Sequence, residues 1–347
     1  MANILDIKRR IRSVINTRQI TKAMKMVSAA KLRRAQDRAL AARPYAQMLT
    51  NVLKSLVSRA EIYDPETGEP RHPLLAQRQE RNVLLIVVTG DKGLAGAFNT
   101  NILKSAMQFL GEKAGKNIEL ETIGRKGRDF LRRRFSTAEP RTAESAEPVR
   151  TTMIGEQVGV LNKVDHALAT KLAERVIERY SEGAIDAVYL IFNEFKSVIQ
   201  QRLVVERVLP IIEVGVAQVQ VARELTQREK EEAKKAAISA GVGMRSTEGA
   251  AIDAAAAGFA TAPVDYIYEQ SPAELFNDLL PKYVGIQIFH ALLESVAAEH
   301  AARMTAMESA TNNATDMIDS LTLAMNRARQ AKITKEIIEI VSGAAAQ

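Results

Sequence analysis

The chain has 347 residues, a net charge of +7 and 46% hydrophobic residues, so it can bury one sizeable core and keep part of its length for an extended element. Cysteine and tryptophan are both absent, which excludes a disulfide framework, a thiolate metal site and a thiol redox switch. No run approaches the roughly 18 to 20 apolar residues that cross a bilayer, and no apolar signal-peptide core begins the sequence. We therefore expect a soluble or peripheral protein.

Positive charge is concentrated at the N-terminal end. Residues 1–60 hold 14 Lys and Arg against two acids, Asp6 and Asp37, a local charge of +12 that leaves −5 for the rest. Nucleic acid, an anionic membrane and an acidic protein surface would all suit such a segment. The basic residues surround the expected helix and no aromatic residue for base stacking precedes Tyr45, so we favour an acidic protein partner.

Residues 1–60 are predicted to form a long coiled-coil helix. Pro44 could kink or bend it. The apolar positions recur at helical spacing, first at Ile7, Ile11 and Val14 and, after a shift, at Ile20, Met24 and Val27.

Residues 80–215 alternate between strand and helix patterns. Apolar strands are expected at 83–88 and 118–123, each followed by a glycine-rich turn and a helix, and a strand pair at 187–192 and 197–208. The alternation predicts an α/β domain. Residues 216–262 are rich in Ala, Gly and charge and are interpreted as a flexible insertion that contains a short charged helix.

Residues 272–347 are predicted to form a second long helix. Its heptad positions are Met304, Met307, Thr311, Ala314, Ile318, Leu321, Met325 and Ala328. The next seam position is Lys332, and the apolar set slips to Ile333, Ile337 and Ile340. Either the helix leaves its partner there or the packing changes register. The predicted fold is a central Rossmann-like α/β domain flanked by long N- and C-terminal helices that form an antiparallel coiled coil.

No catalytic, cofactor or metal site is predicted. The four histidines are scattered without metal-like spacing, and nothing resembles a nucleophile elbow or an acid/base carboxylate pair. The turn 90–96 invites an anion-binding interpretation, but it matches neither the P-loop nor the dinucleotide pattern, so we interpret it as a tight strand-to-helix turn.

Several motifs resemble the gamma subunits of F-type ATP synthases. The C-terminal segment 326–345 reads NRARQAKITKEIIEIVSGAA and segment 18–31 reads RQITKAMKMVSAAK. The middle agrees through GDKGLAG at 90–96, IGRKG at 123–127 and FNEF at 192–195. The resemblance covers the chain except the segment near 216–262.

The resemblance implies a non-catalytic central-stalk rotor subunit. It would transmit torque from the proton-driven c ring to the alpha3-beta3 catalytic ring, and would regulate ATPase activity and proton flow. The implied partners are the alpha, beta, epsilon and delta subunits and the c ring, without nucleic acid, and with membrane contact only through the complex. The implied location is the cytoplasmic face of the bacterial inner membrane, which we favour over an organellar inner membrane. Residues matched to beta-subunit contacts are Lys22, Met24, Lys25, Arg329, Gln330, Thr334 and Glu336.

Two other functions also fit these sequence patterns. A nucleotide-binding α/β protein with coiled-coil arms is the second hypothesis, and a coiled-coil nucleic-acid binder is the third. The segment 216–262 stands where plastid gamma subunits carry a redox-active cysteine pair, a switch that a cysteine-free chain cannot operate. Either an inert linker or a cysteine-free brake on reverse rotation fits this segment.

Overall fold

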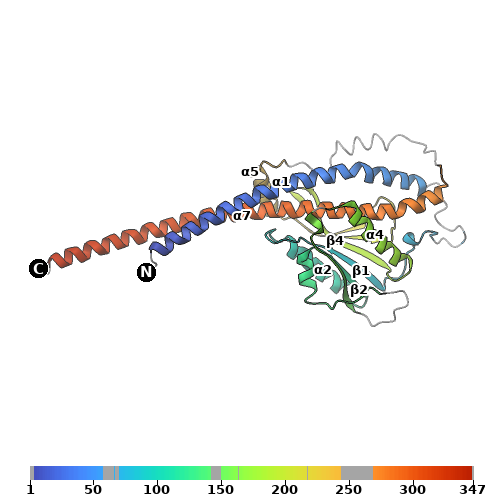
Figure 1. Cartoon of the computed structure of the whole chain (residues 1–347), viewed down its shortest axis with the longest axis horizontal. Helices are drawn as coiled ribbons and strands as arrows, with labels where there is room; N and C mark the ends of the chain where they lie inside the picture. Colours follow the sequence, from blue (N-terminus) through green and yellow to red (C-terminus); the bar gives the residue numbers. More distant parts are fainter. Residues whose placement is uncertain are drawn as a thin grey trace.

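A computed structural model of the chain describes residues 4–57, 66, 70–141, 150–162, 164–216, 218–243 and 269–345. Two long helices from opposite ends of the chain lie antiparallel and project together from an α/β body (Figure 1). They are α1 (Ile4–Val57) and α7 (Pro272–Ala345). We call these two helices the rod. The predicted fold class is confirmed.

The body is built on one six-stranded sheet in the order β3-β2-β1-β4-β5-β6. The first four strands in this order are mutually parallel, β5 is antiparallel to β4, and β6 is antiparallel to β5. The strands are β1 (Asn82–Val88), β2 (Asn117–Ile123), β3 (Thr151–Gln157), β4 (Ala187–Ser197), β5 (Gln200–Leu209) and β6 (Gln218–Glu224). The expected pairing of the last two predicted strands is observed as the β4–β5 hairpin.

Helices cover the sheet, and the body comprises the sheet with α2, α3 and α4. The helices are α2 (Phe98–Glu112), α3 (Arg125–Leu131), α4 (His166–Ser181) and α5 (Gln227–Ser239), with 3₁₀ turns at Pro73–Leu75 and Val160–Asn162. Asp165 caps α4, and Thr226 and Glu229 form a capping box at the start of α5.

The central strand β1 is buried on both faces, which explains its continuous apolar sequence. Because side chains alternate along a strand, Leu84, Ile86 and Val88 enter the core with α4, the C-terminal half of α1 and the first part of α7. The intervening residues enter a second core with α2 and the middle of α1 and α7. Both helices of the rod therefore pack into the body as well as on each other.

The segment interpreted as a flexible insertion with a short charged helix contains that helix as α5, and it also contains a strand, β6, that the sequence did not predict. Strand β6 pairs with β5 along the edge of the sheet, and α5 packs its alanine face, including Ala233, Ala236 and Ala237, into the second core. The sequence signal for β6 is weak because an edge strand needs little apolar character; its residues are mostly half-buried or exposed. The Ala/Gly tract 244–262 lies outside the described residues.

A second missed element is β3, whose sequence TTMIGEQ shows no apolar alternation. It forms the opposite edge of the sheet, where one face is only partly covered. Pro44 lies inside α1, on an exposed position, and does not end the helix. The division into domains at 60, 80, 215 and 262 stays a prediction.

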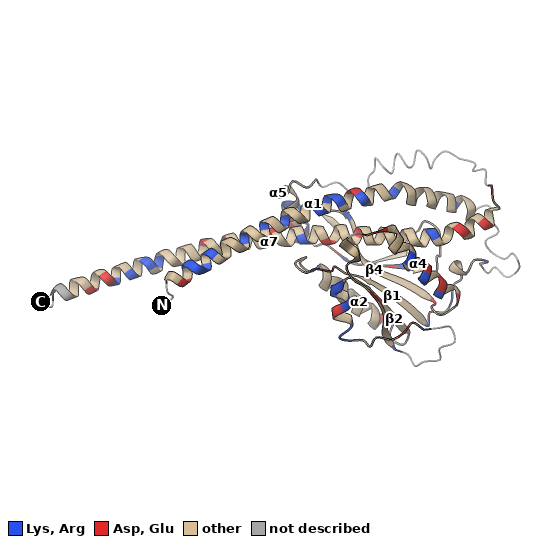
Figure 2. Cartoon of the chain, in the orientation of Figure 1, with Lys and Arg blue, Asp and Glu red and all other residues tan. Residues whose placement is uncertain are grey.

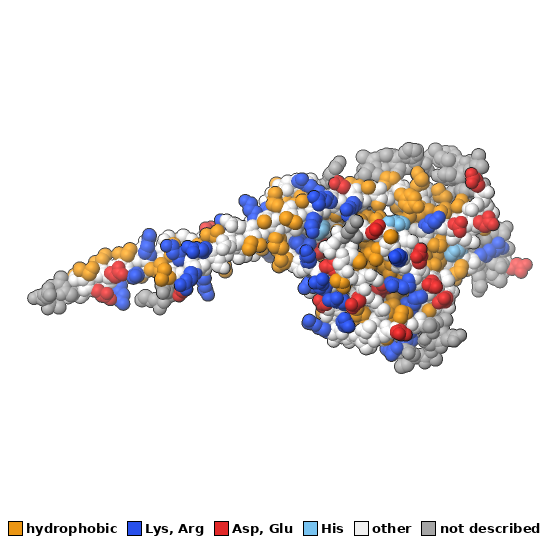
Figure 3. Space-filling model, in the orientation of Figure 1, with side chains coloured by type: hydrophobic (Ala, Val, Ile, Leu, Met, Phe, Trp, Pro, Cys, Tyr) orange, Lys and Arg blue, Asp and Glu red, His pale blue; other side chains and the backbone are white. Residues whose placement is uncertain are grey.

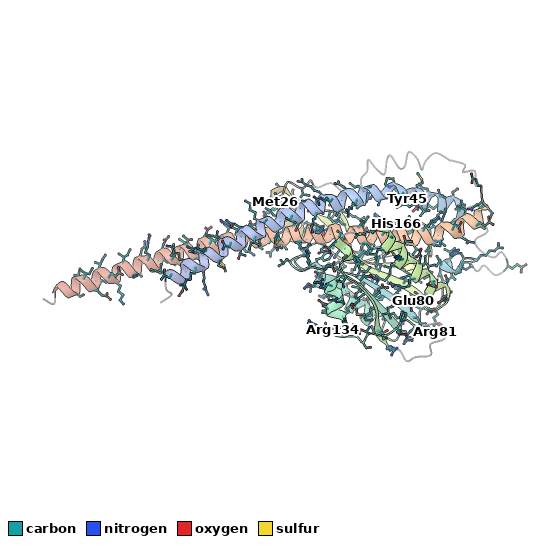
Figure 4. All side chains as sticks on the ribbon, in the orientation of Figure 1. Met26, Tyr45, Glu80, Arg81, Arg134 and His166 are labelled. Carbon is teal, nitrogen blue, oxygen red and sulfur yellow. The ribbon has the colours of Figure 1, made fainter. Side chains whose placement is uncertain are left out.

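An ion cluster ties the segment before β1 to the neighbouring elements. Glu80 (labelled in Figure 4) accepts hydrogen bonds from Lys113 and Lys116, each at 2.6 Å, and from the Tyr189 hydroxyl at 2.6 Å. Burial alone would raise the pKa of Glu80, but these three donors outweigh it and lower the pKa to about 2. The carboxylate therefore stays charged at neutral pH and holds α2 and β4 against the chain entering β1.

Candidate functional site: a two-helix rod

The seam between α1 and α7 follows the heptads predicted for α7. Met304, Met307 and Ala314 are buried, and Thr311, Ile318, Leu321, Met325 and Ala328 are half-buried, so these positions face α1. The heptad prediction for the C-terminal helix is confirmed.

The seam predicted for α1 is only half right. Ile7 is buried and Ile11 and Val14 are half-buried, as expected. In the resumed set, Met24 is half-buried, but Ile20 and Val27 are wrong because they are 59% and 57% exposed. The seam is formed instead by Thr21, Lys25, Ser28, Ala29, Leu32 and Ala35. Small and polar residues hold this stretch of the interface, so hydrophobic periodicity could not reveal it.

Polar contacts pair across this stretch. The hydroxyls of Thr21 and Thr311 lie 2.8 Å apart and are hydrogen-bonded. One turn further along α1, the Lys25 ammonium lies 2.6 Å from Glu308 on α7 and donates to the Ser239 hydroxyl of α5 at 2.8 Å. Both Lys25 and Glu308 are largely buried, with side chains 6% and 15% exposed. This contact joins three helices where the rod leaves the body.

Helix α7 extends beyond the start of α1, and its free end, residues 329–342, is exposed at every position. We call these residues the tip. Ile333, Ile337 and Ile340 are 48%, 54% and 72% exposed and recur at helical spacing, so the tip presents an apolar stripe to its surroundings (Figure 3). Of the two explanations for the slip after Ala328, the structure selects the first: the helix leaves its partner.

The predicted contact residues fall into two groups that the structure does not bring together. Lys22 is exposed and Met24 half-buried near the body, whereas Arg329, Gln330, Thr334 and Glu336 are exposed on the tip. Lys25 faces Glu308, which is 21 residues before Arg329, so the two groups lie roughly 30 Å apart along the helix axis at about 1.5 Å per residue. On the tip, Lys332 pairs with Glu336 at 3.6 Å.

Lys25 lies in different surroundings from the other predicted contact residues. Its side chain is buried between three helices and engaged by Glu308 and Ser239, so it stabilises the rod internally. The exposed charge is carried by its neighbours along α1, where Lys and Arg follow the rod on several sides (Figure 2). They are Lys8, Arg9, Arg10, Arg12, Lys22, Lys31, Arg33 and Arg34.

The turn after β1 is occupied by α7. Ligands of α/β proteins bind outside the carboxyl ends of parallel strands where the strand order reverses, and here that place lies between β1 and β4. The Glu299 carboxyl group packs so closely on Gly90 that an added Cβ there would lie 2.8 Å from it. Arg303 pairs with Glu299 and donates to the Gly93 carbonyl at 3.3 Å.

The second glycine turn packs on the first. Gly124 has φ of 103°, and an added Cβ would lie 1.9 Å from the Thr89 carbonyl oxygen, so only glycine fits. Gly127 N–H donates to the Thr89 hydroxyl at 2.8 Å. Both turns therefore serve packing of the body and rod, which agrees with the structural interpretation of these motifs and disfavours a nucleotide at this place.

Within the described part of the chain, no group of three or more His, Cys, Asp and Glu residues is placed to hold a metal ion. In the same residues, no helix combines the length and apolar character needed to span a membrane.

Comparison with known proteins decides the family. The family model described as "ATP synthase" matches residues 3–347. The ATP synthase gamma chain of Solibacter usitatus (strain Ellin6076) is 49% identical over 346 residues, which cover 100% of this chain and 99% of the relative. The chain belongs to the ATP synthase gamma-chain family.

Further relatives of this family agree. The ATP synthase gamma chain of Anaeromyxobacter sp. (strain Fw109-5) is 44% identical over 348 residues, with coverage of 100% and 99%. A chain in a structure of the Euglena gracilis mitochondrial ATP synthase, comprising OSCP, F1 and the c-ring, aligns with a TM-score of 0.53 at 18% identity. That alignment covers 99% of this chain and 94% of the other, and it shows a shared fold.

Replacing Lys25 by Met should destabilise the chain, because Glu308 is left as a buried carboxylate without its cation. We expect a loss of about 3 kcal/mol in the free energy of unfolding, measured by guanidinium denaturation. Lys22→Met, three residues away and exposed, is the matched control and should change stability by less than about 0.5 kcal/mol. Equal effects of the two substitutions would contradict the internal role of Lys25.

Proposed function

We propose that this chain is the central-stalk rotor subunit of a proton-translocating ATP synthase and has no catalytic site of its own. It would transmit torque from the c ring to the catalytic ring of alpha and beta subunits. The single observation that carries this proposal is the exposed tip of α7, whose apolar stripe has no partner within the described chain. Membership of the gamma-chain family supports it.

The shape of the molecule suits this role. Helix α7 has 74 residues, so it is roughly 110 Å long at about 1.5 Å per residue. One part packs into the body, a second part pairs with α1, and the tip stands alone (Figure 1). The rod would pass into the alpha-beta ring while the body sits toward the c ring, the epsilon subunit and, within the complex, the delta subunit.

The proposed mechanism is mechanical. A single rod surrounded by several equivalent subunits presents a different face to each of them. Rotation then brings the apolar stripe and the basic surface of α1 to each beta subunit in turn, and each face favours a different conformation of that subunit. Rotation of the rod is coupled to the beta subunits because each of their conformations makes different contacts with the rod.

The proposed contacts with the beta subunits are Lys22 and Met24 on the rod and Arg329, Gln330, Thr334 and Glu336 on the tip. All except Met24 are exposed in the chain alone, and Met24 is half-buried. We place the complex at the cytoplasmic face of a bacterial inner membrane, which the chain would meet only through its partner subunits. The family and the relatives from Solibacter and Anaeromyxobacter support this location.

Copurification tests the proposal directly. The affinity-tagged full chain, expressed with the other subunits of the proposed complex, should recover alpha and beta subunits at about three of each per chain, as a ring around one rod requires. Recovery of the tagged chain without these subunits would contradict the proposal. Saturable ATP or NAD binding by the chain alone would instead favour the nucleotide-binding alternative.

Replacing Arg329 by Ala should impair the assembled complex. A guanidinium at an interface is a frequent hot spot, so we expect ATP hydrolysis to fall about tenfold, which corresponds to about 1.4 kcal/mol. The control is Arg133→Ala, the same change at an exposed position on the body. If both variants hydrolyse ATP at the wild-type rate, Arg329 is not a force-bearing contact.

Regulation of ATPase activity is the second part of the proposal. Ser239 at the end of α5 accepts a hydrogen bond from Lys25, and the Gly241 carbonyl just after α5 accepts one from Arg33. The chain that follows α5 therefore begins directly beside α1. We propose that residues 244–262 slow reverse rotation when no proton gradient is present.

Deleting residues 244–262, with β6 and α5 kept, should raise the rate of ATP hydrolysis roughly fivefold when no proton gradient is present. A fivefold change is at the lower end of ordinary allosteric effects. Rates with an imposed gradient should stay unchanged. A Gly-Ser segment of equal length is the control that separates sequence from length. Identical hydrolysis rates for all three proteins under both conditions would leave the segment as an inert linker.

A further inference from the structure

A polar cavity of about 460 Å³ lies at the junction of the rod and the body. Its walls come from α1, α7 and the β4–β5–β6 side of the sheet. The titratable and charged side chains that face it are Arg43 from α1, Glu194 from β4, Glu206 from β5, and Tyr283, His290 and Glu294 from α7. Neither the family resemblance nor the proposed rotary role assigns a purpose to this cavity.

Glu206 is the unbalanced charge in this cavity. It is 8% exposed, and within the described residues its carboxylate has no hydrogen bond and no ion pair. Burial raises its pKa to about 7, and the nearby Glu194 carboxylate adds to this shift. A buried carboxylate without a partner is costly, and a cation placed beside it would remove that cost.

Glu194 and the His290–Glu294 pair have partners in the cavity walls, and the Arg43 guanidinium influences the pKa of His290 and Glu294 but is not among the groups that shift the pKa of Glu206. Arg202 donates two hydrogen bonds to the Glu194 carboxylate. His290 Nδ1 lies 3.2 Å from Glu294 Oε1. Burial and the Arg43 guanidinium lower the pKa of His290 to about 4, while burial raises the pKa of Glu294, so both shifts favour the uncharged forms of this pair. Glu206 is therefore the carboxylate in this cavity that a positively charged ligand would stabilise.

The rest of the lining indicates which kind of cation fits. Phe192 and Tyr283 contribute aromatic rings, which favour organic ammonium groups. The buried Gln287 Oε1 also lines the cavity and has no hydrogen-bond partner within the described chain, so it offers a neutral acceptor. No metal-binding cluster exists among the described residues, so a bare metal ion is the poorer match.

We propose that this cavity binds a small organic ammonium ion, an alkylamine or diamine, with the Glu206 carboxylate as counter-ion and Gln287 Oε1 as hydrogen-bond acceptor. The ligand would contact α1, α7 and β5 together, and so would bridge the rod and the sheet. This inference does not depend on the rotary function, because it concerns the isolated chain.

Isothermal titration calorimetry of the purified full-length chain at pH 8 tests the proposal. The probes are n-butylamine and 1,4-diaminobutane, with n-butanol as the neutral isostere and potassium chloride as the ionic-strength control. We expect saturable 1:1 binding of the amines and none of the controls. Equal binding of butanol, or no saturable binding of either amine, would overturn the proposal.

Two variants locate the site. Glu206→Gln keeps the shape and removes the charge, and it should weaken amine binding at least tenfold. Glu213→Gln makes the same change at an exposed residue of the β5–β6 connection that does not line the cavity, and it should bind as the wild type does. Unchanged binding by Glu206→Gln would exclude Glu206 as the counter-ion.

The wild-type chain supplies an independent readout if Glu206→Gln fails to fold. Because the pKa of Glu206 is about 7 in the empty cavity, whereas an alkylamine stays protonated below pH 8, binding should weaken roughly tenfold from pH 8 to pH 6. At pH 7, about half a proton should be released per ligand bound, measured in buffers of different ionisation enthalpy. Binding that is independent of pH and releases no proton would contradict the proposal.

Discussion

Helices α1 and α7 come from opposite ends of the chain, and their antiparallel seam holds both the rod and the body together. The sheet is sandwiched by helices that include the inner halves of these same two helices, so the cores cannot form unless α1 and α7 meet. Along the stretch of α1 near Thr21 and Lys25, the seam uses small residues and paired polar groups, such as Thr21 with Thr311 and Lys25 with Glu308. Paired polar groups tolerate no shift in register, because each displaced partner would be left buried and unsatisfied.

This chemistry explains which parts of the structure could be predicted from sequence. The heptads of α7 and the buried strand β1 are apolar at regular spacing, and both were predicted correctly. Ile20 and Val27 continue an apolar pattern in α1 but face outward. In this stretch, polar contacts with α7 and α5 determine which side of α1 is buried. Strands β3 and β6 were missed since edge strands are held by backbone pairing, which leaves little trace in side-chain pattern.

The candidate site was predictable in its position but not in all its members. The slip after Ala328 marks the point where α7 loses its partner, and the isoleucines beyond it are exposed. Lys25 could not be separated from Lys22 by sequence, since both are basic residues of one helix. Only the position of Glu308 shows that one points inward and the other outward. The polar cavity around Glu206 left no signal, because its walls come from segments far apart in the chain.

The occupation of the β1 turn by Glu299 and Arg303 has a mechanical consequence. In many α/β proteins this crevice is open to a ligand, whereas here a charged pair on α7 is seated in it, against Gly90 and the Gly93 carbonyl. A smooth helix could spin against a sheet by exchanging one apolar contact for another at little cost. The Glu299 and Arg303 side chains, packed against the backbone at Gly90 and Gly93, oppose such sliding, so this contact fixes the orientation of α7 relative to the sheet.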